Sequence, residues 1–189
     1  MVDCIKKENY FNKLIEQKIK NQFEVIKRID TYIGTTNTKC TIIMSYCTAV
    51  IALQILLLSR IDLENATIQL IVSIGLACSL SLITSVVCML MACLTIFPIT
   101  FSSPSNYRGT SLIFYGDIVN IKDGSDGYVR KINEVSEEAY LNDLSDQVFT
   151  LAGIVSHKFH IIQSLSVILC VHFLCLISFL MACMFHFLS

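Results

Sequence analysis

The sequence predicts an all-α membrane protein with about three transmembrane helices and a small helical cytosolic head. Three observations support this prediction: long uncharged apolar runs, charged residues gathered between those runs, and helical stripes of apolar residues before the first and third runs. The apolar runs are Cys40–Ser59, Ala66–Phe97 and Ile161–Ser189. Each is long enough to cross a hydrocarbon core of ~30 Å as a helix, which takes about 20 residues.

Composition supports the membrane assignment. Of the 189 residues, 54% are hydrophobic and 15% are charged, whereas soluble domains average about 45–50% apolar and about 25% charged. Most of the nine cysteines lie inside the apolar runs, where they behave as small packing residues. No CxxC pair or Cys/His ligand spacing is present, so the sequence predicts neither a metal site nor a cofactor.

The positions of Lys and Arg predict the orientation. Eight of the fourteen lie before Cys40, five lie between the second and third runs, and Arg60 is the remaining one. Cytosolic loops of membrane proteins carry an excess of these residues. We therefore expect a multi-pass membrane protein with its N-terminus in the cytosol and its C-terminus outside.

The chain divides into four predicted segments. Residues 1–39 form a cytosolic amphipathic helix, 40–97 a transmembrane hairpin, 98–160 a cytosolic sensing region and 161–189 the third transmembrane helix. The stripe of the first segment recurs at spacings of three and four and consists of Phe11, Ile15, Ile19, Gln22, Ile26, Ile29 and Ile33. We expect this stripe to pack on a neighbouring helix; a membrane-surface helix is the alternative, weakened by the mixed charges on its other faces.

The second span holds a row of small residues four positions apart: Ser73, Ala77, Ser81 and Ser85. Such rows let membrane helices approach closely. Packing within one chain and self-association explain the row equally well, so it is a candidate surface for assembly into a homo-oligomer.

The sensing region begins with turn-forming residues, continues through the stretch SLIFYGDIV at Ser111–Val119, and ends in a strongly predicted helix from Ser136. Ser136 is a good N-cap, and Glu137 and Glu138 suit the positive end of the helix dipole. The apolar stripe that follows consists of Leu141, Leu144, Val148, Leu151, Val155, Phe159 and Ile162. It enters the third apolar run without a breaker, so we expect one helix from the cytosol through the membrane.

The sequence contains no convincing catalytic motif, such as a Gly-rich phosphate loop, HExxH or a nucleophile elbow, so we do not expect an enzyme. His157 and His160 are spaced to bind metal on a helix, but beside Lys158 they fit a polar collar at the membrane boundary better. His172 lies well inside the third span, where ionisable residues are costly and often functional. A neutral histidine bonded to a neighbouring helix is favoured over a pore or proton role, and His172 is also a candidate residue for assembly in the membrane.

The sensing region offers a candidate site for an anionic ligand. Arg108, Arg130 and Lys131 can hold a phosphate, Tyr115 and Tyr128 can stack on a base, and Asp117 can read a base edge. The alternative is that these residues bind no ligand: the charges are solvated and the aromatic side chains fill a small core.

The order of these segments resembles the Pycsar effector family of bacterial membrane proteins. The resemblance rests on three places. Asn37–Cys40 matches a D-x-K-A segment before the first span with two departures, Leu112–Gly116 is similar to a Leu-Leu-Phe-Phe-Gly pattern, and Lys158 and Phe159 match a Lys-Tyr/Phe pair before the last span.

This resemblance implies a function in defence against phage. In the family, a cytosolic cyclase makes cyclic UMP or cyclic CMP on infection, and the membrane effector senses that nucleotide and impairs the membrane, so that infection is abortive. The implied partners are a cyclic pyrimidine mononucleotide, the lipid bilayer and other copies of the chain, and no nucleic acid polymer. The alternatives are a constitutive structural or assembly subunit that binds a protein partner and, less well supported, a small transporter or membrane enzyme.

Overall fold

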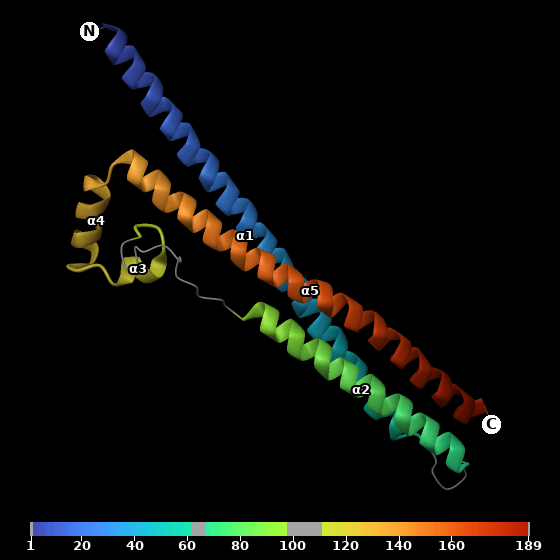
Figure 1. The fold of residues 1–189 in the computed structure, drawn as a ribbon. Coiled ribbons are helices and arrows are strands. Elements are labelled where there is room, and N and C mark those ends of the chain that lie inside the picture. Colours follow the sequence, from blue (N-terminus) through green and yellow to red (C-terminus); the bar gives the residue numbers. More distant parts are fainter. Residues whose placement is uncertain (1, 62–66, 98–110, 189) are drawn as a thin grey trace. The chain divides into compact units, whose positions relative to one another are not determined.

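The fold is all-α over the described part of the chain, with three long helices and two short ones. The computed structural model describes residues 2–61, 67–97 and 111–188, with side chains from residue 10 onward. The helices are α1 (Val2–Leu58), α2 (Ile68–Ile96), α3 (Tyr115–Val119), α4 (Gly124–Glu134) and α5 (Glu137–Leu188) (Figure 1). Within the described residues, α1, α2 and α5 are long and apolar enough to span a membrane, which confirms the predicted fold class.

The predicted N-terminal amphipathic helix and the first span form one uninterrupted helix, α1. The junction Gly34–Thr38 is rich in weak helix formers. Thr38 of this junction nevertheless fits the helix because its hydroxyl donates to the Gly34 carbonyl, one turn earlier, at 3.0 Å, and Thr41, which follows the junction, donates in the same way to the Asn37 carbonyl at 3.0 Å. This back-bonding satisfies polar groups without water.

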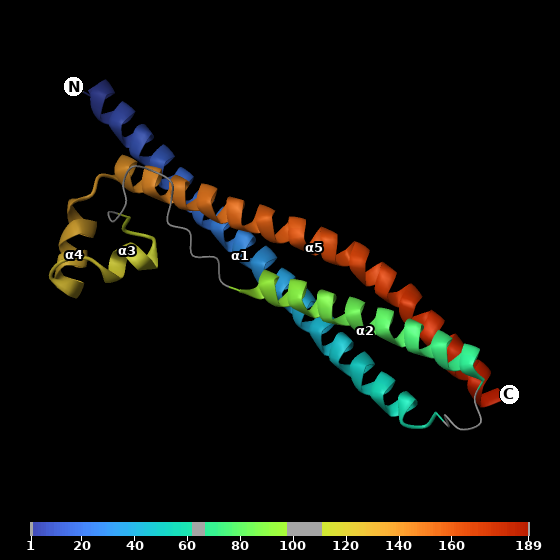
Figure 2. The ribbon, with the colours of Figure 1, turned by 60° about the horizontal axis from the view of Figure 1, so that its bottom comes forward.

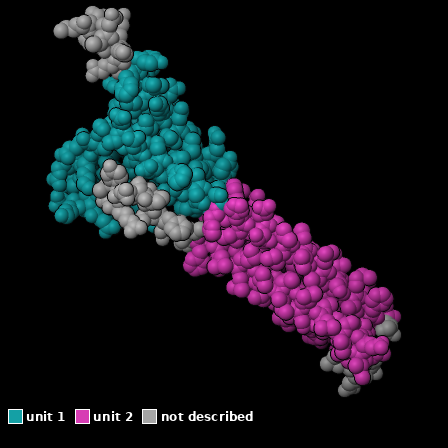
Figure 3. All heavy atoms as spheres, in the orientation of Figure 1, with its two compact units in different colours: residues 1–33, 98–156 teal, residues 34–97, 157–189 magenta. Residues whose placement is uncertain are grey.

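The chain forms two compact units (Figure 3). Unit 1 contains residues 1–33 and 98–156, and unit 2 contains residues 34–97 and 157–189. Helices α1 and α5 contribute residues to both units, whereas α3 and α4 belong to unit 1 and α2 to unit 2.

Unit 1 is held by the two predicted stripes. Ile15 and Ile29 of α1 are buried, as are Leu144 and Val155 of α5. The amide of Gln22, which interrupts the α1 stripe, donates to Ser145 Oγ at 3.3 Å. Phe11 departs from the prediction, because 55% of its surface is exposed.

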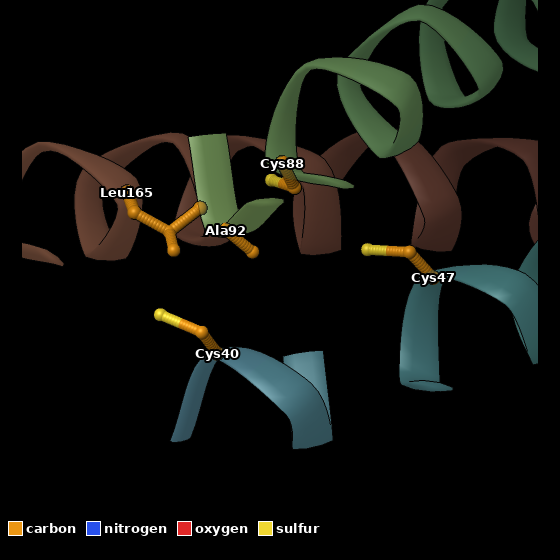
Figure 4. Packing of buried hydrophobic residues seen from close by; sticks show 5 residues of the cluster. All are labelled: Cys40, Cys47, Cys88, Ala92 and Leu165. Atoms are coloured by element: carbon orange, nitrogen blue, oxygen red, sulfur yellow. The ribbon is translucent and has the colours of Figure 1, made fainter. Parts of the chain in front are cut away.

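Unit 2 packs α2 beside the membrane parts of α1 and α5, as two views of the ribbon agree (Figures 1 and 2). Its core has two apolar clusters. The first joins Cys40 and Cys47 of α1, Cys88 and Ala92 of α2 and Leu165 of α5 (Figure 4). The second joins Ile74 and Cys78 of α2 with Phe179 and Cys183 of α5. The small cysteine and alanine side chains let the three helices approach closely.

The absence of a side chain at Gly127 lets α4 lie close to the main chain of the segment before it. Gly127 is buried, and a Cβ at this position would collide with the main-chain carbonyl of Lys122. Gly153 of α5 has nothing within 4 Å of the corresponding point.

We therefore expect Gly127→Ala to lower the unfolding free energy by about 1–3 kcal/mol through overpacking. Gly153→Ala is the matched control and raises the free energy by up to about 1 kcal/mol, because alanine is the better helix former. Thermal unfolding of the detergent-purified protein, read together with hydrogen exchange of residues 111–134, measures both. Equal effects of the two substitutions would contradict the close approach at Gly127.

Candidate functional site

The residues before and within α3 form a tightly hydrogen-bonded turn. The Ser111 amide donates to Asp117 Oδ2 at 3.1 Å, and Ser111 Oγ accepts from the Ile113 and Phe114 amides at 3.2 and 3.0 Å. Backbone N–H groups at the start of a helix need such acceptors. Asp117, predicted to read a base edge, therefore has one carboxylate oxygen committed to holding this turn.

The turn is fastened to α5 and α4. The Leu112 amide donates to Asp143 Oδ2 at 2.8 Å, and the Tyr128 hydroxyl donates to the Leu112 carbonyl at 3.2 Å. Tyr140 lies close by: burial first, and then the nearness of Tyr128 and Asp143, raise its pKa above the ordinary value of 10.0. Tyr140 therefore stays protonated at neutral pH, and the predicted base-stacking Tyr128 serves first to hold the turn.

The remaining predicted ligand residues lie on the surface of unit 1. Tyr115 is 62% exposed, with its ring centroid 4.9 Å from that of Phe114. Arg130 on α4 donates to Asp123 Oδ2 at 2.7 Å in an exposed ion pair, and Lys131 is exposed on the same helix. Arg108, the sixth predicted residue, lies outside the described residues. Tyr115, Arg130 and Lys131 are thus the predicted side chains available to a ligand.

The row of small residues on α2 divides between two environments. Ser73 is exposed and Ala77 is partly exposed, whereas Ser81 and Ser85 are fully buried. Ser81 Oγ accepts from the side-chain amide of Gln54 at 2.6 Å. Ser81 and Ser85 therefore face neighbouring helices of the same chain.

His172 is fully buried in unit 2. Its Nδ1 lies 3.0 Å from Thr84 Oγ1 of α2, and its ring meets that of Tyr46 edge-on with centroids 5.7 Å apart. The arrangement agrees with the expectation of a histidine bonded to a neighbouring helix.

Lys158 is a buried polar residue that the sequence reasoning misplaced. The predicted stripe turned Phe159 inward and left Lys158 in an exposed collar with His157 and His160. The structure buries Lys158 to 3% exposure and leaves Phe159 47% exposed. His157 and His160 are exposed, whereas the prediction of an exposed lysine beside them is wrong.

Two oxygen acceptors compensate the buried ammonium of Lys158. Its Nζ donates to Asn37 Oδ1 of α1 at 3.2 Å and to the main-chain carbonyl of Thr95 in the last turn of α2. A cation at a helix C-terminus is also favoured by the helix dipole. Lys158 thereby links all three long helices. The signal that could have found it is its helical spacing from Val155, Ile162 and Leu165, which position 158 fits as well as 159.

Comparison with known families gives one match. The model of the Pycsar effector protein domain matches residues 21–186, which include all three long helices from Asn21 of α1 onward. The chain belongs to the Pycsar effector family. Searches of curated proteins and of solved structures found no match.

The bond between Lys158 and Asn37 also joins two segments that carry the resemblance to the Pycsar effector family. Two of the three segments on which the resemblance rested, Asn37–Cys40 and Lys158–Phe159, meet in unit 2 through the Lys158–Asn37 bond. Asn37 stands where the family-like segment carries Asp. A carboxylate there would turn this hydrogen bond into an ion pair. In the present chain the charged lysine bonds to the neutral amide oxygen of Asn37 instead.

We expect Asn37→Asp to stabilise the protein by about 0.5–2 kcal/mol, because it adds attraction between opposite charges to a hydrogen bond whose donor is already charged. Asn37→Leu should destabilise it by about 1.5–3 kcal/mol, because it removes an acceptor from a buried cation. Unfolding of the protein in detergent measures both changes. Asn21→Asp, exposed on the same helix, should have little effect.

A double-mutant cycle isolates the contact. With Lys158→Met in place, the gain from Asn37→Asp should disappear. A gain that survives the loss of Lys158 would show that the two side chains do not interact.

Proposed function

We propose that this Pycsar effector senses a cyclic pyrimidine mononucleotide, cyclic UMP or cyclic CMP, in the cytosol and in response impairs the integrity of the bacterial inner membrane. The single observation that carries this proposal is the family match over residues 21–186. Three helices able to span a bilayer place the chain where such an effect takes place. The positive residues of the predicted cytosolic segments favour an N-terminus inside the cell.

The surface of unit 1 supplies chemistry suited to the nucleotide. Tyr115 offers an exposed aromatic face for a base. Arg130 and Lys131 offer positive charge for the cyclic phosphate, and Arg130 can exchange its exposed partner Asp123 for a phosphate because such surface ion pairs are weak. Tyr115 belongs to the turn that carries α3, and Arg130 and Lys131 belong to α4, which the Tyr128 hydroxyl ties to that turn.

The bond from Leu112 to Asp143 gives a route for a response. Through it, the turn that carries α3 is tied directly to α5, and α5 continues as one helix to Leu188. A nucleotide that binds one arrangement of this turn better than another would shift the population of α5 states. Only such differential affinity can drive the change.

A homo-oligomer in the bilayer is part of the same proposal. Ser73, Gly75 and Ser79 lie exposed on α2, and Gly75 and Ser79 are four positions apart. Small residues at this spacing allow a second membrane helix to approach closely. The assembly surface that we propose is therefore this exposed part of α2 rather than the buried Ser81 and Ser85.

The first test is calorimetric binding of cyclic UMP, cyclic CMP, cyclic AMP and cyclic GMP to the detergent-purified protein. We expect one pyrimidine nucleotide to bind and the purine nucleotides to be silent. Arg130→Glu should weaken binding at least tenfold, because it replaces attraction to the phosphate by repulsion.

Asp123→Asn is the matched control for this test. It breaks the same ion pair without reversing the charge at position 130, and asparagine tolerates the left-handed backbone of Asp123 (φ 67°). Full nucleotide binding by Arg130→Glu would show that Arg130 does not bind the phosphate. No binding to any nucleotide by the folded wild-type protein would favour the alternative of a constitutive assembly subunit, whose expression has the same effect on cells with or without nucleotide.

A further inference from the structure

A cluster of buried polar side chains lies in the middle of the membrane part. Gln54 of α1, Ser81 and Ser85 of α2 and His172 of α5 are all fully buried. They form a connected set: Gln54 bonds to Ser81, Ser81 is one turn from Ser85, and His172 Nδ1 lies 3.0 Å from Thr84 Oγ1 between them. Tyr46 joins the set through its edge-on contact with His172.

Four polar atoms of this cluster have no hydrogen-bond partner among the described residues: Tyr46 Oη, Gln54 Oε1, Ser85 Oγ and His172 Nε2. Ser85 would ordinarily bond to the carbonyl one turn earlier, that of Ser81, but Thr84 Oγ1 already lies 3.0 Å from that oxygen. Buried polar groups in proteins are nearly always satisfied by protein or by water. In the hydrocarbon region, lipid supplies neither donor nor acceptor.

We propose that this cluster, which we call the polar layer (Tyr46, Gln54, Ser81, Thr84, Ser85 and His172), binds water inside the membrane. A buried water typically makes about three hydrogen bonds to otherwise unsatisfied groups, and the polar layer offers four such atoms. The inference concerns the protein without nucleotide and does not depend on the proposed sensing function.

The mixture of groups selects water over an ion. Gln54 Oε1 can only accept, whereas the hydroxyls of Tyr46 and Ser85 can donate or accept. His172 Nε2 needs a donor in one tautomer and an acceptor in the other. Water provides both roles, and the unpartnered atoms carry no formal charge that would favour a cation or an anion.

On α2 and α5 the polar layer lies between the two apolar clusters of unit 2, whereas its Tyr46 packs against the first cluster. On α2, Ser81 and Ser85 lie between Ile74–Cys78 and Cys88–Ala92; on α5, His172 lies between Leu165 and Phe179. The water site therefore interrupts the apolar interior of the bundle, which leaves one apolar cluster on each side of it. A change that opens either cluster would extend the hydrated region toward one side of the membrane.

Water-edited solid-state NMR of protein labelled on histidine and phenylalanine, in liposomes without nucleotide, tests the proposal. The chain has four histidines, and the His172 signal is identified by its loss in His172→Gln. We expect magnetisation from water to build up on the His172 ring nearly as fast as on the exposed His157 and His160. A build-up as slow as that of the buried Phe179 ring would overturn the proposal.

A pair of variants checks that the polar layer is the source of the signal. Gln54→Leu combined with Ser85→Ala should abolish fast build-up on His172, because it removes two of the four partners. Ser166→Ala, whose hydroxyl is exposed and donates to the Ile162 carbonyl, should leave it unchanged. If the double variant fails to fold, the wild-type comparison of His172 with Phe179 still decides.

Because no nucleotide is present, the outcome is separate from that of the calorimetric test. A dry His172 in a protein that still binds its nucleotide would refute the water site and leave the sensing proposal intact. A hydrated His172 in a protein that binds no nucleotide would support the water site and refute the sensing proposal.

Discussion

The constraint on which the rest of the structure depends is that a hydrocarbon environment provides no hydrogen-bond partners. Every backbone group in the spans must be satisfied within its own helix, which explains why α1, α2 and α5 continue unbroken through segments of poor intrinsic helix propensity. The same constraint governs the side chains. Thr41, Ser45 and Thr48 of α1 each donate to a carbonyl one turn earlier, so a helix rich in hydroxyls presents few unsatisfied groups.

Lys158 shows how the constraint can also specify an arrangement of helices. A buried ammonium is costly unless its protons are placed on acceptors. Here one acceptor is on α1 and the other is at the end of α2, so the lysine keeps both bonds only when its part of α5 lies against both of these sites. Apolar packing of cysteines, alanine and leucine holds the helices together, and the lysine fixes their register.

The architecture could be predicted from the sequence because it rests on strong and local signals. The apolar runs were long enough to identify all three membrane helices, and the stripes predicted the buried faces of Ile15, Ile29, Leu144 and Val155. Periodicity could not decide between Lys158 and Phe159, because adjacent positions fit a helical stripe almost equally well. The choice depends on acceptors supplied by two other helices, which the sequence alone does not bring together.

The candidate ligand site was less predictable for a related reason. Residue type identified aromatic, basic and acidic side chains that suit a nucleotide, but their availability depends on tertiary hydrogen bonds. Asp117 and Tyr128 are used to hold the turn before α3, whereas Tyr115 and Lys131 remain at the surface. The polar layer was foreseen only in part: His172 and the serines of α2 stood out in the sequence, but their convergence with Gln54 and Tyr46 depends on how the three helices pack.

The proposed function requires that a cyclic nucleotide bound by unit 1 changes the membrane helices so that the bilayer leaks. This proposal is tested most directly by dye release from liposomes that contain the purified protein, with each cyclic nucleotide in turn present on both sides of the bilayer. The account predicts release with cyclic UMP or cyclic CMP and none with purine nucleotides or with empty liposomes. Intact liposomes in the presence of a nucleotide that the same preparation binds would contradict it.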